Sequence, residues 1–357
     1  MIYDTSVDLI QEKVLDGGRI TPEEAGRLYR ALTLPEIGAL ADAVRRRKRP
    51  GKQVTYIIDR NINYTNVCNV YCTFCAFMRE ERDDDSYVLT PEQVGAKIRE
   101  LTAIGGVQIL MQGGHHPKLG IDYYLDLLRY IRQNFPQVNI HGFSPPEFCH
   151  FAEVFKMPLE EVVRRFKEAG LGSIPGGGGE ILVDRVRNRI APLKCKSDDW
   201  LRVMEIAHGL GLNSSATMMF GHVETVEDRL EHLGRLRDLQ DRTHGFTAFI
   251  CWTFQAEHTR LKVRPAGAHE YLRTQALARI FLDNFDNVQS SWVTQGPQIG
   301  QVALQYGAND FGSVMMEENV VSQAGTTFCL NEETMRRLIT ELGYEPHRRN
   351  NWYQLLN

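Results

Sequence analysis

Short apolar runs alternate with amphipathic segments along most of the chain, beginning near residue 53. The apolar runs are rich in β-branched and aromatic residues and show no strict alternation, which is typical of parallel strands covered on both faces. We therefore predict strands at residues 54–62, 107–112, 138–143, 172–174, 213–220, 246–254, 288–294 and 311–316.

The amphipathic segments carry recognisable helix starts. Residues 1–50 read as two or three helices, one of which begins at Thr21, where a threonine, a proline and a glutamate form a capping box. The same chemistry at Thr90 and Thr225 predicts two further helices, and residues 159–169 have apolar side chains at helical spacing.

Eight strands that alternate with helices over about 280 residues match a TIM-type (β/α)8 barrel in size and order. The alternative is an open doubly wound sheet, which would place a glycine-rich phosphate turn after the first strand. A cysteine loop follows that strand instead. We expect an N-terminal helical extension (residues 1–52), an α/β barrel (53–325) and a C-terminal helical segment that packs on the barrel (326–357).

Composition and charge exclude several partners. The chain has 357 residues, of which 43% are hydrophobic and 24% charged, and its formal net charge is -4. This balance gives no electrostatic basis for binding nucleic acid. No apolar run approaches the ~20 residues of a membrane span, and the N-terminus lacks the pattern of a signal peptide. We expect a cytoplasmic protein that binds neither nucleic acid nor membrane.

Three cysteines within eight residues are the strongest chemical signal in the chain: Cys68, Cys72 and Cys75. Three thiolates can hold a 4Fe–4S cluster and leave its fourth iron open to another ligand. A zinc site is the alternative, but it normally needs four ligands, and the remaining cysteines are isolated along the chain. A disulfide framework does not suit a large chain without a secretory leader. We therefore predict one open-iron cluster.

Unusual residues follow the predicted strands, where the active face of a barrel is built. Gly113 and Gly114 follow the second strand, Ser144 and Glu147 follow the third, and a run of four glycines before Glu180 follows the fourth. In a barrel, all of these residues would lie at the same end, because they follow strands that run parallel. Their positions therefore support both the predicted barrel and the predicted site.

The cysteine loop, with Phe74 just before its last cysteine, resembles that of the radical S-adenosylmethionine (SAM) superfamily. The resemblance implies that SAM binds the open iron and is cleaved to a 5′-deoxyadenosyl radical. It also implies that Gly113 and Gly114 approach the methionine amino group and that Glu180 binds the ribose hydroxyls. The remaining SAM contacts expected from the resemblance are Phe74, Ser144, Met219 and Glu224.

Longer stretches, such as RNINYTNVCNVYCTFCAF and SSWVTQGPQIGQVALQYGANDFGSVMMEEN, resemble the dehypoxanthine futalosine cyclase family of the futalosine route to menaquinone. The resemblance spans nearly all of residues 53–325. It implies hydrogen abstraction from ribose C4′ of dehypoxanthine futalosine and radical addition to the benzoate ring, with a flavodoxin or ferredoxin as electron donor. Aminofutalosine synthases and the deazaflavin-chromophore enzymes are alternatives within the same chemistry, and a non-catalytic cluster carrier is a third.

Such a reaction requires a dry cavity that holds the two reacting carbons close together. The aromatic residues near strand ends that fit this need are Phe143, Trp252, Phe254 and Trp292. A proton acceptor is also required, and the unranked candidates are His141, Glu147, His222 and Asp310. Because a benzoate carboxylate favours an arginine partner, we assign that role to Arg60.

Overall fold

The computed structural model describes residues 5–326 and 328–356. Within them, ten strands form one sheet in which every neighbouring pair is parallel. The strands are β1 (Gln53–Ile57), β2 (Asp59–Asn63), β3 (Gln108–Gln112), β4 (Asn139–Gly142), β5 (Ser173–Ile174), β6 (Asn213–Phe220), β7 (Phe246–Thr253), β8 (Val288–Gln289), β9 (Asp310–Ser313) and β10 (Glu345–Arg348).

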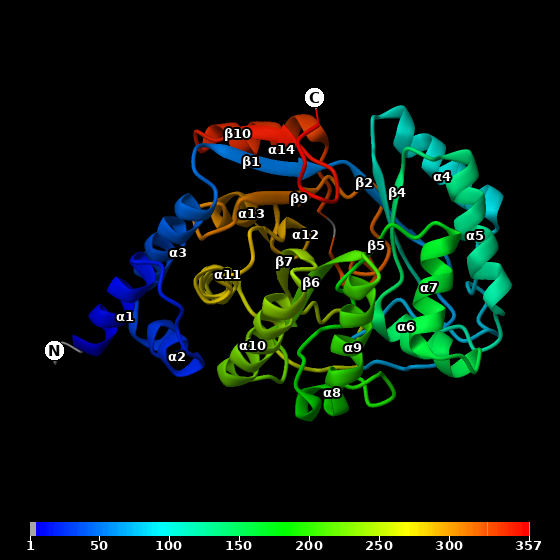
Figure 1. Ribbon diagram of the computed structural model, residues 1–357, viewed down its shortest axis with the longest axis horizontal. Coiled ribbons are helices and arrows are strands. Elements are labelled where there is room, and N and C mark those ends of the chain that lie inside the picture. Colours follow the sequence, from blue (N-terminus) through cyan, green and yellow to red (C-terminus); the bar gives the residue numbers. More distant parts are fainter. Residues whose placement is uncertain (1–4, 327, 357) are drawn as a thin grey trace.

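Helices separate most of the consecutive strands, and the longer ones lie outside the curled sheet (Figure 1). They are α1 (Thr5–Leu15), α2 (Pro22–Ala31), α3 (Leu34–Lys48), α4 (Pro91–Ala103), α5 (Ile121–Asn134), α6 (Pro145–Val154), α7 (Leu159–Ala169), α8 (Asp184–Ile190), α9 (Ser197–Gly209), α10 (Val226–Thr243), α11 (Ala268–Phe281), α12 (Trp292–Gln295), α13 (Pro297–Ala303), the 3-10 helix η1 (Ser322–Ala324) and α14 (Glu332–Glu341).

The first extended segment of the sheet changes partners halfway along its length. The strand order is β10-β1-β9-β8-β7-β6-β5-β4-β3-β2, and β1 and β2 are consecutive parts of one extended segment divided at Ile58. β1 pairs with β9, whereas β2 pairs with β3, so this segment joins the two sides of the curl. The expected α/β fold of the TIM type is confirmed, in the form of a partial barrel.

The predicted helix starts are confirmed. At the start of α2, Thr21 Oγ1 accepts a hydrogen bond from the Glu24 N–H (3.2 Å), and Glu24 accepts one from the Thr21 N–H (2.8 Å). Thr90 and Thr225 cap α4 and α10 in the same way. The N-terminal helices cover one side of the sheet, where α3 packs against α11 and α2 against α10 (Figure 1).

Two predicted elements need correction. The strand expected at residues 288–294 ends at Gln289, and its second half forms the helical turn α12. Val293 and Thr294 favour a strand locally, but the buried indole of Trp292 holds the turn by donating a hydrogen bond to the Ser313 carbonyl (3.0 Å). The C-terminal segment, expected to be helical, contains α14 and also β10, which pairs with β1. The domain boundaries stay a prediction.

In the part of the chain that the structure describes, no helix is both long enough and apolar enough to cross a bilayer.

Candidate functional site

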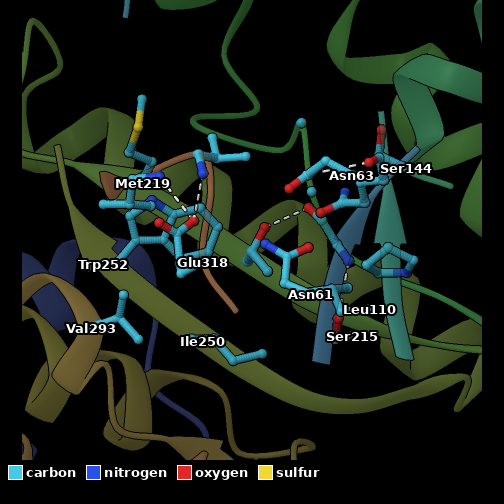
Figure 2. A pocket seen from close by; sticks show the side chains of 18 of the residues that line it. Asn61, Asn63, Leu110, Ser144, Ser215, Met219, Ile250, Trp252, Val293 and Glu318 are labelled. Carbon is cyan, nitrogen blue, oxygen red and sulfur yellow. Dashed lines mark hydrogen bonds between the residues drawn. The ribbon is translucent and has the colours of Figure 1, made fainter. Parts of the chain in front are cut away.

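A cavity of about 450 Å³ occupies the inside of the curled sheet. It begins among the loops that follow the strands, including the cysteine loop (residues 64–79), and continues to Arg349, Asn351 and Tyr353 of the C-terminal segment. Figure 2 shows Met219, Trp252 and Glu318 on one side of this cavity and Asn61, Asn63, Leu110 and Ser144 on the other.

All three predicted cluster ligands, Cys68, Cys72 and Cys75, are free thiols that line the cavity. Burial raises the pKa of Cys68, and it raises the pKa of Cys72 to about 12. Cys68 and Cys72 therefore keep their protons until a metal displaces them. Among the described residues, no three His, Cys, Asp or Glu side chains are placed to hold a single metal ion. Cys68, Cys72 and Cys75 therefore do not converge on one metal ion such as zinc.

The glycine pair after β3 fits tightly against the cysteine loop. The Gly114 N–H donates a hydrogen bond to the Thr65 carbonyl (2.9 Å). A Cβ atom at Gly114 would lie 2.1 Å from the Val67 carbonyl oxygen, and one at Gly113 would lie 2.5 Å from the Tyr64 ring. Both positions therefore require glycine for the packing of the loop itself, whereas the sequence analysis assigned this need to the approach of SAM.

Glu180 also lines the cavity, and two cations hold it in place. Lys194 Nζ lies 2.9 Å from Glu180 Oε1, and Arg187 lies 3.5 Å from Oε2. Burial lowers the pKa of Lys194, but the attraction of Glu180 outweighs it, so the pKa lies above its usual value. Lys194 also lies over the ring of Phe74, 5.2 Å from its centre. The sequence analysis missed Lys194, because an isolated lysine in a loop carries no recognisable pattern.

The other predicted SAM contacts divide into two groups. Ser144 and Met219 line the cavity. Glu224 does not, because its carboxylate accepts hydrogen bonds from the Gly221 N–H (2.7 Å) and from Arg229 (2.6 Å). Burial would raise the pKa of Glu224, but the attraction of His222 and Arg229 lowers it below its usual value. This placement does not favour a contact of Glu224 with SAM.

Two of the four proton-acceptor candidates line the cavity, and both are held by other groups. His141 Nδ1 lies 2.7 Å from Ser173 Oγ, and burial lowers the pKa of His141 to about 3, so its ring is neutral at pH 7. Glu147 accepts hydrogen bonds from the Tyr64 hydroxyl (2.7 Å), the Gly113 N–H (3.1 Å) and both the N–H and the hydroxyl of Ser144. Burial raises the pKa of Glu147, although these bonds oppose it.

The other two candidates are not among the lining residues. His222 Nδ1 lies 3.0 Å from Glu224, and burial lowers its pKa. Asp310 is fully buried in an ion pair with Arg349, whose Nε and Nη2 atoms lie 2.5 and 2.8 Å from its two oxygens. Neither placement favours a role as proton acceptor.

The assignment of Arg60 to the substrate carboxylate is wrong, because side chains alternate along β2. Arg60 points away from the cavity and forms ion pairs with Glu100 (2.6 Å) and Glu317 (2.7 Å). Its neighbours Asp59, Asn61 and Asn63 line the cavity instead. This alternation of polar residues within a buried strand was visible in the sequence and could have identified them.

Three of the four aromatic candidates line the cavity: Trp252, Phe254 and Trp292. Phe143 does not. It has a positive φ of 56° and packs with Tyr64, Tyr124, Phe151 and Phe166 in the core.

Two cysteines that are isolated along the chain meet in the fold. The Cys149 thiol donates a hydrogen bond to the Cys195 sulfur, and Arg187 lies 3.9 Å from that sulfur. Cys251 is buried and donates to Gln275 (3.1 Å). None of these three lines the cavity. They are therefore not placed to act as further ligands of a cluster at the cysteine loop.

Two protein-family models match consecutive parts of the chain. The radical SAM superfamily model matches residues 62–236, and the model for the CofH/MqnC C-terminal region matches residues 243–357. The second match begins just before β7 and includes β10.

Curated relatives match nearly the whole chain. It is 46% identical to a cyclic dehypoxanthine futalosine synthase from Halalkalibacterium halodurans, over 98% of this chain and 95% of that protein. It is 38% identical to an aminodeoxyfutalosine synthase from Thermus thermophilus, over 99% and 96% respectively.

Among solved structures, methylornithine synthase has the same fold, with a TM-score of 0.74, 16% identity and coverage of 95% of this chain and 97% of the other. At that identity the likeness concerns the fold alone.

Proposed function

Because this chain belongs to the CofH/MqnC family within the radical SAM superfamily, we propose that it converts dehypoxanthine futalosine into its cyclic product. The reaction takes the hydrogen atom from ribose C4′ and joins this carbon to the benzoate ring, as a step of menaquinone formation. The ring then loses one proton and one electron, which restores its aromaticity. A small electron carrier, a flavodoxin or a ferredoxin, supplies the electron, and the reducing cytoplasm is the compartment that suits the cluster.

One observation carries the proposal. The three thiols, the glycine pair and the Glu180–Lys194 ion pair, which lie far apart in the sequence, all line one cavity. A cluster carrier would need the thiols alone, and a zinc site would need a fourth ligand. Neither alternative explains why the three thiols face a large cavity. A cluster that must act on a cofactor and a substrate in that cavity does explain it.

The residues fit both cofactors. Cys68, Cys72 and Cys75 would hold three irons of the cluster, and Glu180, which lines the same cavity, would accept hydrogen bonds from the SAM ribose. When bound, the cluster and SAM supply an electron and a 5′-deoxyadenosyl radical, which is able to take a hydrogen atom from carbon. Lys194 orients Glu180, because its Nζ lies 2.9 Å from Glu180 Oε1 and both side chains are almost fully removed from water.

The rest of the cavity positions the substrate and excludes water. Trp252, Phe254 and Trp292 provide flat apolar surfaces against which an aromatic ring can pack. Holding the sugar and the ring together lowers the entropic cost of ring closure. For the proton that leaves the ring, Asp59 joins His141 and Glu147 as a lining group. It is held by Ser313 and, at 3.3 Å, by Gln108, and burial raises its pKa.

Anaerobic turnover tests this function. Protein with a reconstituted cluster is incubated with SAM, dithionite and dehypoxanthine futalosine deuterated at ribose C4′, and the products are identified by mass spectrometry. We expect the cyclic product, methionine and 5′-deoxyadenosine that carries one deuterium. Product formation with deuterium-free deoxyadenosine would place the abstraction at another carbon. Turnover only with an enolpyruvyl-ether benzoate would make the chain an aminofutalosine-forming enzyme.

A further inference from the structure

Three polar side chains at the deep end of the cavity each carry an atom that has no hydrogen-bond partner among the described residues. We define the cavity floor as Asn61 of β2 together with Asn351 and Tyr353 of the segment after β10, all of which line the cavity. Among the described residues, Asn61 Oδ1, Asn351 Nδ2 and the Tyr353 hydroxyl are buried without a hydrogen-bond partner. Asn61 and Asn351 are each only 6% exposed. Such groups are costly unless water or a ligand satisfies them.

The surrounding contacts hold the floor rigid. Arg349 pairs with Asp310 through two hydrogen bonds, and its guanidinium lies 3.9 Å from the centre of the Tyr353 ring. The Arg349 N–H also donates to the Tyr56 carbonyl (2.9 Å), which continues the pairing of β10 with β1. The ring of Tyr353 is therefore fixed by a buried cation, and its hydroxyl is left for another molecule.

The unpartnered atoms define the chemistry of that molecule. Asn61 Oδ1 accepts hydrogen bonds, Asn351 Nδ2 donates them, and the Tyr353 hydroxyl does both. A carboxylate accepts only and an ammonium donates only, whereas a hydroxyl group can satisfy all three. A set of neighbouring hydroxyls, as on a sugar, therefore matches the floor.

The charges at the floor agree with a neutral ligand. Among the described residues that line the cavity, Lys194 and Arg349 are the only lysine and arginine. Lys194 is paired with Glu180 at the cysteine-loop end, and Arg349 is paired with Asp310. No unpaired cation is left at the floor for a carboxylate, and Asp59 lies nearby on the same face of β2 as Asn61.

We propose that the cavity floor, formed by Asn61, Asn351 and Tyr353, binds the sugar hydroxyls of the substrate. Figure 2 shows Asn61 beside Leu110 and Ser215, on the opposite side of the cavity from Trp252. The sugar then lies against the amides, and the benzoate ring lies toward the tryptophan side. The assignment to this substrate rests on the proposed function; the preference for hydroxyl groups does not.

The test compares binding of two ligands by calorimetry, using cluster-loaded protein with SAM and without reductant. The ligands are dehypoxanthine futalosine and a benzoate fragment that lacks the sugar. Asn61→Ala and Asn351→Ala should each weaken binding of the first by roughly threefold to tenfold, as expected for one lost hydrogen bond, and leave binding of the second unchanged. Equal weakening for both ligands, or no weakening for the first, would overturn the proposal.

Thermal unfolding supplies the control, since Asn61 Oδ1 has no hydrogen-bond partner to lose among the residues that the structure describes. Asn61→Ala should leave the unfolding temperature unchanged. Asn63→Ala should lower it, because the Asn63 side chain donates to the Gln112 carbonyl (3.1 Å) and accepts from Asn319 (3.3 Å). A destabilised Asn61→Ala variant would show that the amide is structural and would overturn its assignment.

A second probe separates this proposal from the proposed function. If the wild-type protein does not bind dehypoxanthine futalosine, the proposed function fails, and D-ribose is then titrated while the side-chain amide NMR signals are observed. Shifts confined to Asn61 and Asn351 would support the floor as a sugar site. Signals that do not respond to D-ribose, or that respond equally for Asn63, would overturn it.

Discussion

The two ends of the cavity are built in different ways. The cysteine-loop end carries free thiols, glycines and the buried Glu180–Lys194 pair, and it is formed by loops that follow the strands. The floor carries amides and a tyrosine, and it depends on a C-terminal segment joined to the sheet through β10. One end is suited to charged cofactors and the other to neutral hydroxyl groups. A single cavity can therefore place a radical source and its substrate in a fixed order.

The largest expected effect concerns the cysteine-loop end. Replacing Cys68, Cys72 or Cys75 by alanine should abolish SAM cleavage, because two thiolates do not retain an open-iron cube. Iron content and 5′-deoxyadenosine formation under dithionite measure this loss. The matched control is Cys149→Ser, because Cys149 contacts Cys195 rather than the cavity. Loss of iron in the control would indicate an additional cluster. It would contradict the prediction that the protein holds a single cluster, at the cysteine-loop end of the cavity.

The second prediction concerns the floor. Asp310→Asn removes the partner of Arg349, which is fully buried, and breaking such a pair typically costs about 3–5 kcal/mol. The free energy of unfolding in guanidinium chloride should fall by this amount. Arg337→Ala is the control, because its pair with Glu341 is exposed and is expected to contribute less than about 1 kcal/mol. Similar losses in both variants would mean that Arg349 does not anchor the floor.

The smallest of these effects is expected at Glu180. Glu180→Gln keeps the size of the side chain but weakens its hydrogen bonds to two hydroxyls, at a cost of about 1.5–3 kcal/mol. The dissociation constant for SAM should rise roughly tenfold or more, while iron content stays unchanged. Glu224→Gln is the control, since Glu224 is buried but lies outside the cavity lining. If the control weakens SAM binding and Glu180→Gln does not, the ribose contact belongs to Glu224.

Sequence reasoning worked best where chemistry is local. The capping boxes at Thr21 and Thr90 depend on residues a few positions apart, and the structure confirms them. The cysteine spacing and the glycine pair are equally local, and all five residues line the cavity. It failed for Arg60, because the direction of a side chain depends on which face of a strand meets the cavity. It also failed for residues 292–295, where one buried indole outweighs the strand preference of its neighbours.

The sequence by itself determined the alternation of strands and helices, the thiol triad and the end of the sheet at which the chemistry gathers, because these follow from periodicity and short spacings. Only the tertiary structure decided that Lys194 meets Glu180, that Cys149 meets Cys195 and that Asn351 shares a cavity with Asn61. The physical reason is distance along the chain. Asn351 reaches the cavity because β10 joins β1, and the other two pairs form when the fold brings their segments together; no local preference encodes either outcome.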